Sequence, residues 1–241
     1  MTTKKSPIRS GIHSLSNWLF PQDCLLCQLP LIPAEINSQI PLCTECTSHL
    51  PTIETSCTIC NTPLHNDSIC GVCLQQQRHW DICYSAFEYR QPIDRLIHSF
   101  KYTNKPSHCR YLATLLTNHI NNFHDHPLPE YLIPIPMHHR RLAERGLNHS
   151  LLLTRNLSKY FDIPYRSIVK KNRHTQTQMG LNQKKRQQLI RNSFDVIENI
   201  QTNHVALVDD VMTTGTTCSE VAKILKKSGI STVEVWCLAR T

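Results

Sequence analysis

The sequence lacks long apolar runs and contains little glycine. No stretch approaches the roughly 20 apolar residues that a membrane-spanning helix needs, so we expect no membrane span. The N-terminus carries Lys4, Lys5 and Arg9 but lacks the apolar core of a signal peptide. Only six of the 241 residues are glycine, among them Gly71, Gly146 and Gly215, which lie in the motifs described below.

The first 22 residues show one feature of an amphipathic helix. Ile8, Ile12, Leu15 and Leu19 recur at the spacing of one helix face. This pattern favours a short docking helix, with a transit peptide as the alternative interpretation.

Charge is distributed unevenly along the chain. Residues 1–80 contain four Lys/Arg and five Asp/Glu, whereas residues 81–241 contain 22 and 13. The formal net charge of +8 therefore belongs to the C-terminal part. We expect anionic ligands to bind there.

Eight of the 12 cysteines form four CxxC pairs, all of them before residue 74. In a chain without a secretion signal, such pairs indicate metal sites instead of disulfides. Two tight turns that each present two thiolates complete a tetrahedral zinc site. The four pairs therefore predict two structural Zn²⁺ sites, whose candidate ligands are Cys24, Cys27, Cys43, Cys46, Cys57, Cys60, Cys70 and Cys73.

Two ways of combining the CxxC pairs are open. In sequential pairing the first CxxC pair combines with the second and the third with the fourth, which gives two consecutive ribbons. Interleaved pairing gives a crossed-brace site. The spacers of 15, 10 and 9 residues favour sequential pairing, because it closes the shorter loops. A segment this small buries little without metal, so we assign it a structural role. A docking face for protein or nucleic acid is the alternative, and the slightly acidic balance of the segment disfavours nucleic acid.

The most informative stretch is His204–Thr217, HVALVDDVMTTGTT. The run of four apolar residues at 205–208 predicts a strand that is covered on both faces, as in a parallel sheet. We expect the strand to end at Asp209 and Asp210, and a Thr/Gly loop with a hydroxyl near the N-cap to open a helix over residues 218–227. Free N–H groups and the helix dipole make this loop a candidate phosphate site, and Gly215 allows a close approach.

The other elements complete an α/β pattern. Apolar spacing predicts strands at 82–89, 133–136, 166–169 and 231–239, and helices at 92–102 and 107–122. Cys83 and Cys109 are expected to be buried or partly buried thiols. Lys101 and Tyr102 are expected to face the ligand from a helix end. Residues 119–130, with three histidines, favour a helix end and a solvated loop, and a metal site is the alternative.

Two basic segments lie between these strands. Arg140, Arg141 and Arg145 cluster after the strand at 133–136, and guanidinium groups suit phosphate; a solvated helix start is the alternative. From Arg166 to Arg191 the chain has eight Lys/Arg and no acid, which fits a lid over a bound polyanion. A flexible surface loop or a groove for single-stranded nucleic acid are the alternatives, and the lack of Phe, Tyr and Trp disfavours base stacking.

The stretch His204–Thr217 resembles the loop that binds phosphoribosyl pyrophosphate (PRPP) in type I phosphoribosyltransferases: an apolar strand, two acids and V-x-T-T-G-x-T. It is neither a Walker loop nor a GxGxxG motif. The resemblance implies that Asp209 and Asp210 hold the ribose hydroxyls and that the loop holds the 5′-phosphate. The PRPP-binding residues implied are Val211, Met212, Thr213, Thr214, Gly215, Thr216 and Thr217.

A closer resemblance covers nearly the whole chain. The pattern P-x-x-x-x-R-x-x-x-R-G-x-N, here Pro136, Arg141, Arg145, Gly146 and Asn148, is similar to that of the ComF/GntX family. The family pattern T-x-x-Q-x-x-L-x-x-x-x-R resembles Thr175, Gln178, Leu181 and Arg186. The chain departs from the family at His139, Leu147, His149 and Leu189, where proline, phenylalanine, glutamine and asparagine are usual.

That family resemblance implies the architecture and the ligand. We expect a small Cys-rich double zinc ribbon ahead of a doubly wound, mostly parallel α/β domain of the type I phosphoribosyltransferase kind. The expected limits are an N-terminal segment at 1–22, the ribbon at 23–80 and the transferase-like domain at 81–241. The domain would bind PRPP with Mg²⁺. Arg145, Arg173 and Arg186 are candidates for the pyrophosphate, Arg141 is a further PRPP contact, and the candidate catalytic residues are Asp209, Asp210 and Arg186.

The same resemblance implies a cytoplasmic role in natural transformation, in which incoming single-stranded DNA is handled together with competence and recombination proteins. Two classes of function follow. One is a transferase that acts on an unknown nucleophile. The other is a PRPP-sensing adaptor whose zinc module docks a partner. Because the sequence stops after its last strand, without a C-terminal hood, we expect any acceptor pocket to come from the zinc module or from residues 83–130.

Overall fold

The structure is a computed structural model that describes residues 22–36, 39–66, 68–102, 106–172, 190 and 192–241. It divides into two compact units, Met1–Leu50 and Pro51–Thr241. The helix expected in residues 1–22 lies outside the described residues, apart from residue 22. Most of the basic segment, residues 173–189 and 191, also lies outside them.

The described part of the first unit is organised around cysteines. Its two short helices are α2 (Pro33–Ile36) and α3 (Thr44–Ser48), and neither contains a buried residue. Glu35 of α2 accepts hydrogen bonds from the backbone N–H and the hydroxyl of Thr44, at 2.7 and 2.9 Å. Polar contacts therefore join the two helices, as expected of a segment whose folding depends on metal.

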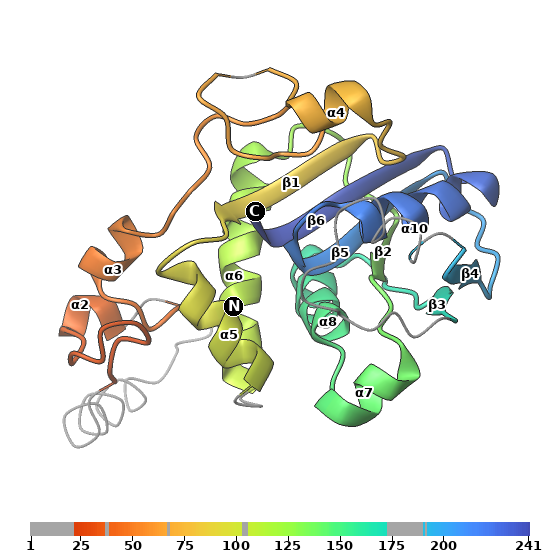
Figure 1. Cartoon of the computed structure of the whole chain (residues 1–241). Coiled ribbons are helices and arrows are strands. Elements are labelled where there is room, and N and C mark those ends of the chain that lie inside the picture. Colours follow the sequence, from red (N-terminus) through yellow and green to blue (C-terminus); the bar gives the residue numbers. More distant parts are fainter. Residues whose placement is uncertain (1–21, 37–38, 67, 103–105, 173–189, 191) are drawn as a thin grey trace, which may run out of the picture. The chain divides into compact units, whose positions relative to one another are not determined.

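The second unit is built on a parallel four-stranded sheet in the order β1-β6-β5-β2 (Figure 1). The strands are β1 (Ile82–Glu88), β6 (Thr232–Arg240), β5 (His204–Met212) and β2 (Tyr131–Pro134). In the central strand β5, residues 205–208 are completely buried. Such burial fits an apolar run in a sheet that is covered on both faces.

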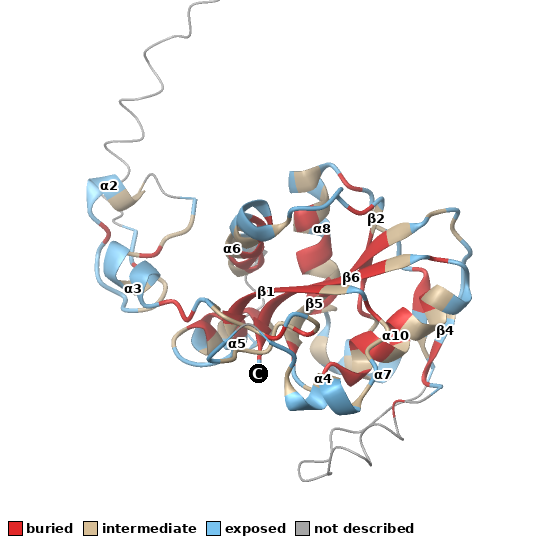
Figure 2. Ribbon diagram, turned by 90° about the horizontal axis from the view of Figure 1, so that it is seen from above, coloured by how far each residue is buried: buried red, intermediate tan, exposed pale blue. Residues whose placement is uncertain are grey.

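Helices cover both faces of this sheet (Figure 2). Helices α6 (Pro106–Phe123) and α8 (His149–Phe161) pack against each other on one face, and α10 (Thr216–Lys227) covers the other. Helix α5 (Ile93–Tyr102) packs against α6. The doubly wound α/β fold predicted from the sequence is therefore confirmed.

Shorter elements complete the second unit. They are the helices α4 (Gly71–Gln75) and α7 (His139–Arg145) and an antiparallel pair of strands, β3 (Val169–Lys171) and β4 (Phe194–Val196). The strand expected at 166–169 thus lies a few residues later. Among the described helices, none combines the length and the apolar character needed to cross a bilayer.

Two details of the site refine the sequence-based expectation. Strand β5 does not end at the two acids: it continues to Met212, because β6 extends to Arg240 and pairs with Asp209, Val211 and Met212. Helix α10 has Gly215 as its N-cap, with φ +71° and no side-chain capping hydrogen bond. The N-cap residue itself is glycine because the turn requires the left-handed conformation, and the expected hydroxyl lies next to it: Thr214 Oγ1 accepts from the backbone N–H of Thr216 at 3.4 Å.

The second cysteine group shares the core of the sheet. Cys57, Cys60 and Trp80 belong to the same buried cluster as Val221 of α10 and Val235 of β6. This cysteine group therefore lies in the same compact unit as the sheet. The limits 23–80 and 81–241 remain sequence-based predictions.

Candidate functional site

The eight paired cysteines form two groups of four. Cys24, Cys27, Cys43 and Cys46 make up the first group, and Cys57, Cys60, Cys70 and Cys73 make up the second, with the sulfurs of each group within 4.8 Å of one another. Sequential pairing is therefore confirmed.

The sulfur spacing in both groups suits zinc. Tetrahedral coordination with zinc–sulfur bonds of about 2.3 Å places neighbouring sulfurs about 3.8 Å apart. The Sγ atoms of Cys27 and Cys43 are 3.8 Å apart, and those of Cys60 and Cys70 are 3.7 Å apart. The donor set and its dimensions therefore fit one structural Zn²⁺ in each group.

The remaining four cysteines are separate from these groups. Cys83, Cys109, Cys218 and Cys237 are buried, which confirms the expectation for the first two. Burial raises the pKa of the Cys109 thiol to about 12, so this thiol stays protonated at neutral pH.

Asp209 lies at the carboxyl end of β5, where open α/β sheets bind ligands. Its Oδ1 accepts hydrogen bonds from the hydroxyl of Ser150 at 2.8 Å and from the backbone N–H of Asp210 at 2.9 Å. Burial and then the neighbouring Asp210 carboxylate raise the pKa of Asp209 to about 7, against the opposing effect of the Ser150 hydroxyl. The Asp209 carboxyl therefore takes up a proton close to neutral pH.

Asp210 forms an ion pair with Lys101 of α5. The distance from Lys101 Nζ to Asp210 Oδ2 is 2.9 Å, and the two side chains are 21% and 14% exposed. The expectation that Lys101 faces the site is thus confirmed, whereas the neighbouring Tyr102 is 63% exposed. This ion pair places a cation beside the two acids, where it is available to an anionic ligand.

The loop after β5 turns sharply into α10. Gly215 has φ +71°, and a Cβ at this position would lie 2.7 Å from the ring of Trp80. The hydroxyls of Thr214 and Thr216 lie 2.9 Å apart. A small pocket of about 40 Å³ is lined by residues 211–218, together with Asp209 and Ile190. The loop and the first turn of α10 therefore surround a space that a phosphate group could enter.

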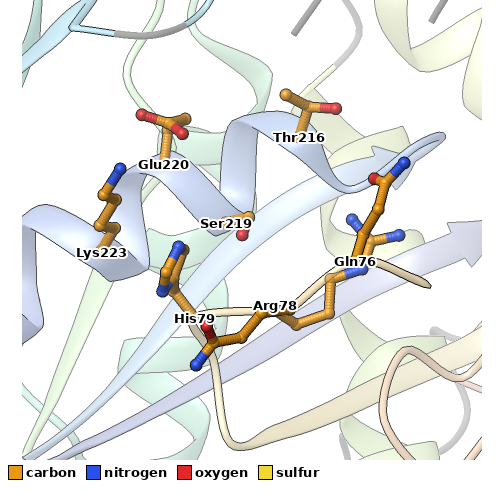
Figure 3. A pocket seen from close by; sticks show the side chains of 8 residues that line it. Gln76, Arg78, His79, Thr216, Ser219, Glu220 and Lys223 are labelled. Atoms are coloured by element: carbon orange, nitrogen blue, oxygen red, sulfur yellow. The ribbon is translucent and has the colours of Figure 1, made fainter. Parts of the chain in front are cut away.

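A larger pocket of about 290 Å³ adjoins the loop on the outer side of α10 (Figure 3). Figure 3 shows Thr216, Ser219, Glu220 and Lys223 of α10 opposite the segment 76–79. Burial and then Lys223 lower the pKa of His79 in this segment. The lining residues are Gln76, Gln77, Arg78, His79, Thr216, Ser219, Glu220 and Lys223.

The predicted arginines lie in two different parts of the chain. Arg141 and Arg145 are on α7, which begins after β2 and ends at Gly146, with φ +73°. Both side chains are partly exposed. Arg173 and Arg186 lie outside the described residues, so their expected contact with pyrophosphate stays a prediction.

Position 149, where the family usually has glutamine, is a buried histidine at the start of α8. His149 is 2% exposed, and its ring meets Phe100 edge-on at 4.8 Å. Its Nδ1 is buried without a hydrogen-bond partner among the described residues. Burial lowers the pKa of His149, although Asp210 opposes the shift. Burial therefore favours the neutral imidazole, which packs against Phe100.

The histidine-containing stretch after α6 is not simply a solvated loop. His124 has a side chain that is 3% exposed, and its Nε2 lies 3.1 Å from Oε2 of the buried Glu234. His204 lies 2.8 Å from Oε1 of the same carboxylate, and the indole N–H of Trp236 donates to it at 2.6 Å. These side chains form a hydrogen-bonded network at the start of β5 and β6, at the opposite end of the strands from Asp209.

Several residues around the site were missed by the sequence reasoning. They are Arg78, Trp80, Ser150, Ile190 and Arg240, which contact the acids or the loop or line the loop pocket. Arg240 had a usable signal, because a charged residue that follows an apolar run in a strand requires a buried partner.

Comparisons with known proteins agree with these observations. Residues 15–74 match the family described as Double zinc ribbon domain, and residues 147–241 match the Phosphoribosyl transferase domain. Competence protein F of Haemophilus influenzae is 41% identical over 178 residues, which cover 71% of this chain and 78% of that protein. DNA utilization protein YhgH of Shigella flexneri is 34% identical over 226 residues, which cover 92% and 98%.

Solved structures give a more distant likeness. Glutamine PRPP amidotransferase from B. subtilis is 18% identical, with a TM-score of 0.38, over 64% of this chain and 31% of that one. This likeness is too distant to carry an argument. The close relatives, the double zinc ribbon and the transferase-type domain are sufficient: the chain belongs to the ComF/GntX family, together with competence protein F and DNA utilization protein YhgH.

Proposed function

We propose that the site at the end of β5 binds PRPP. The observation that carries the proposal is the order of polar groups along one edge of the sheet. Asp209 and Asp210 lie near the end of β5, which ends at Met212, and the turn at Gly215 then opens α10. Carboxylates accept hydrogen bonds from a ribose diol, and N–H groups at the start of a helix bind a phosphate.

The charge around the site supports an anionic ligand with a polar sugar. Lys101 lies 2.9 Å from Asp210, and Arg145 lies on α7, which begins close after β2, the neighbour of β5. A pyrophosphate group needs such cations, whereas the ribose needs the acids. In this proposal Mg²⁺ accompanies PRPP, because magnesium usually keeps several waters and bridges substrate phosphates.

The transferase form of the proposal has a defined bond change. The bond between C1 of the ribose and the pyrophosphate oxygen breaks, pyrophosphate leaves with the bonding electrons, and a nucleophile forms the new bond to C1. Asp209 and Asp210 hold the ribose hydroxyls during this step. Lys101, Arg145 and Arg141 supply positive charge for the leaving group, together with Arg173 and Arg186 of the basic segment.

A PRPP-sensing adaptor is the second candidate. The observation that favours it is the shared core of the second cysteine group and the sheet, since Cys57 and Cys60 pack in the same buried cluster as α10. Ligand binding at the loop would then change the conformation of the metal module, which docks a partner. The two candidates differ in one result, because only the transferase converts PRPP with release of pyrophosphate.

The biological setting that we propose is natural transformation in the cytoplasm. Its support is the similarity to two relatives, competence protein F and DNA utilization protein YhgH. We further propose that the protein contacts single-stranded DNA and that the basic segment between Arg166 and Arg191 binds the DNA backbone. It predicts that affinity falls steeply with salt and after charge reversal at Lys184, Lys185 and Arg186. A DNA affinity that is insensitive to both salt and charge reversal would exclude this contact with DNA.

The first experiment is isothermal calorimetry of PRPP binding, with and without magnesium. It compares the wild type with the double variant Asp209→Asn, Asp210→Asn. We expect magnesium-dependent binding to the wild type and its loss in the double variant. A matched control, Asp125→Asn with Glu198→Gln, removes two exposed acids elsewhere in the same unit and should bind PRPP like the wild type. No binding to the wild type would reject the proposal.

A second assay then separates the two candidates. Protein that binds PRPP is incubated with it, and released pyrophosphate is measured over time. Release that depends on Asp209 and Asp210 supports the transferase, whereas tight binding without turnover across candidate nucleophiles supports the adaptor.

A further inference from the structure

Arg240, near the end of β6, connects the second cysteine group with the start of the phosphate loop. The side chain is 5% exposed. Its Nε donates to the carbonyl of Cys60 at 3.2 Å, and its Nη1 donates to the carbonyl of Met212 at 3.0 Å. Its Nη2 lies 3.9 Å from the Cys60 sulfur. One buried guanidinium therefore touches both a metal ligand and the residue at which β5 ends.

Arg78 makes a second connection of the same kind. Its Nη1 donates to the carbonyl of Thr214 at 3.0 Å, and its guanidinium interacts with the thiol of Cys73. Its Nε and Nη2 are buried without hydrogen-bond partners of their own among the described residues. The guanidinium carbon lies 5.2 Å from the centre of the Trp80 ring, which also packs against Gly215.

Trp80 completes the connection. Its indole N–H donates to the carbonyl of Ile59 at 2.7 Å, so the ring is tied to the turn between Cys57 and Cys60. Its other edge reaches the place where a side chain on Gly215 would lie, 2.7 Å from the position of a Cβ. The loop is thus contacted by three side chains, those of Arg240, Arg78 and Trp80, and each of them also contacts the second cysteine group or the turn between Cys57 and Cys60.

We propose that Arg78 and Arg240 are positioning residues of the phosphate loop, and that they couple zinc binding by Cys57, Cys60, Cys70 and Cys73 to anion binding at residues 213–217. The identity of the anion as PRPP rests on the proposed function. The coupling itself rests on the two arginines, each of which contacts a cysteine of this group and a loop carbonyl.

The geometry of the peptide bond explains how the arginines act. In a trans peptide the carbonyl of one residue and the N–H of the next point in opposite directions. Holding the carbonyl of Met212 therefore turns the N–H of Thr213 away from Arg240. Holding the carbonyl of Thr214 likewise turns the N–H of Gly215 away from Arg78. Two loop N–H groups are thereby preset for an anion on the other side of the loop.

Charge gives a second reason why the metal matters. A zinc ion with four thiolates would carry a net negative charge, and the guanidinium groups of Arg240 and Arg78 lie beside two of its candidate ligands, Cys60 and Cys73. A buried cation is stable only when it is paired or fully hydrogen-bonded. Zinc in this group therefore favours the arginine positions that hold the loop. By reciprocity, an anion that requires the held loop stabilises zinc in the same group.

The test uses the full chain loaded with zinc and compares Arg78→Met with Arg110→Met. Arg110 is an exposed arginine on α6, so this control removes the same charge away from the loop. We expect Arg78→Met to weaken PRPP binding about tenfold in calorimetry, within the usual range of coupling between sites. Arg110→Met should bind PRPP like the wild type. Equal affinity of Arg78→Met and the wild type would overturn the proposal.

Zinc release supplies the reciprocal readout. A chromogenic chelator removes zinc from the wild type in the presence or absence of PRPP. Two double variants distinguish the cysteine groups: Cys43→Ser with Cys46→Ser disrupts the first group, and Cys70→Ser with Cys73→Ser disrupts the second. We expect PRPP to slow release about tenfold from the second group and to leave release from the first group unchanged. An equal effect on both groups, or on neither, would contradict the coupling.

Hydrogen exchange keeps this proposal separate from the proposed function. Backbone amide exchange at residues 213–217 is measured without ligand, in the wild type and in Arg78→Met. We expect exchange in this loop to be about tenfold faster in the variant, with no change in α6. If the wild type binds no PRPP and the loop still loosens, the proposed function fails and the positioning role stands. If exchange in the loop is unchanged, the positioning role fails.

Discussion

Replacing Asp209 with asparagine should make the protein more stable while removing its proposed ligand contact. Burial and the adjacent Asp210 raise the pKa of Asp209 from 3.8 to about 7, so the ionised form is disfavoured in the folded state. Asparagine keeps the oxygen that accepts from the Ser150 hydroxyl at 2.8 Å and removes the charge. The variant should therefore relieve electrostatic strain that the wild type carries at neutral pH.

The magnitude follows from the pKa shift. A rise of about three units corresponds to about 4 kcal/mol at 1.36 kcal/mol per unit. Asp209 keeps part of its surface in water and lies near Lys101, so we expect about half of this value, ~2 kcal/mol. For a unit of this size, that gain raises the melting temperature by about 4–8 °C.

The pH dependence gives the sharper test. Because the folded-state pKa of Asp209 lies above the unfolded-state value, the folded protein binds the extra proton between about pH 4 and pH 7. The free energy of unfolding of the wild type therefore falls as pH rises through this range and levels off above it. The asparagine variant lacks this decline. Its advantage should be ~2 kcal/mol at pH 8.5 and about half as large at pH 5.5.

Chemical denaturation at both pH values measures these differences, with Asp210→Asn as the control. Asp210 forms the 2.9 Å ion pair with Lys101, so its replacement removes an attraction as well as a repulsion and should yield a smaller gain. A loss of stability in Asp209→Asn at pH 8.5, or a gain of the same size at both pH values, would refute the electrostatic reasoning.

Three further predictions concern Gly215, Glu234 and the pH dependence of ligand binding. Gly215→Ala should lower the free energy of unfolding by about 2 kcal/mol or more in denaturation, because the residue has φ +71° and its new Cβ would lie 2.7 Å from Trp80. The control Gly146→Ala has φ +73° but open space around the new Cβ, so it should lower the free energy of unfolding by about 1 kcal/mol. Glu234→Leu should cost about 3–5 kcal/mol, since it leaves His124, His204 and Trp236 without their buried acceptor, and calorimetry should find PRPP affinity unchanged. PRPP affinity of the wild type should fall as pH drops from 8 to 6, because Asp209 takes up a proton near pH 7 and then no longer accepts two hydrogen bonds from a diol.

The sequence predicted the parts of the structure that depend on local pattern. The apolar run before Asp209 predicted a strand whose residues 205–208 are completely buried, and CxxC spacing predicted the two cysteine groups. Sequential pairing followed from loop length. These features need only neighbouring residues, so one chain is enough to predict them.

Contacts between distant segments were not predictable in this way. Arg78 reaches the Thr214 carbonyl across 136 positions, and Arg240 reaches the Cys60 carbonyl across 180. Neither arginine belongs to a motif, and no spacing rule relates them to the loop. The two cysteine groups look alike in sequence, yet only the fold shows that the second group shares the core of the sheet.

The scarcity of glycine bears on how this loop keeps its shape. A phosphate loop with several glycines can adopt many backbone conformations, whereas residues 213–217 contain one. Its geometry is held from outside by hydrogen bonds to the carbonyls of Met212 and Thr214 and by Trp80 against Gly215. Such a loop loses little conformational entropy when an anion binds, because much of the ordering precedes the ligand. In our proposal its affinity therefore depends on the segments that hold it, among them the second cysteine group.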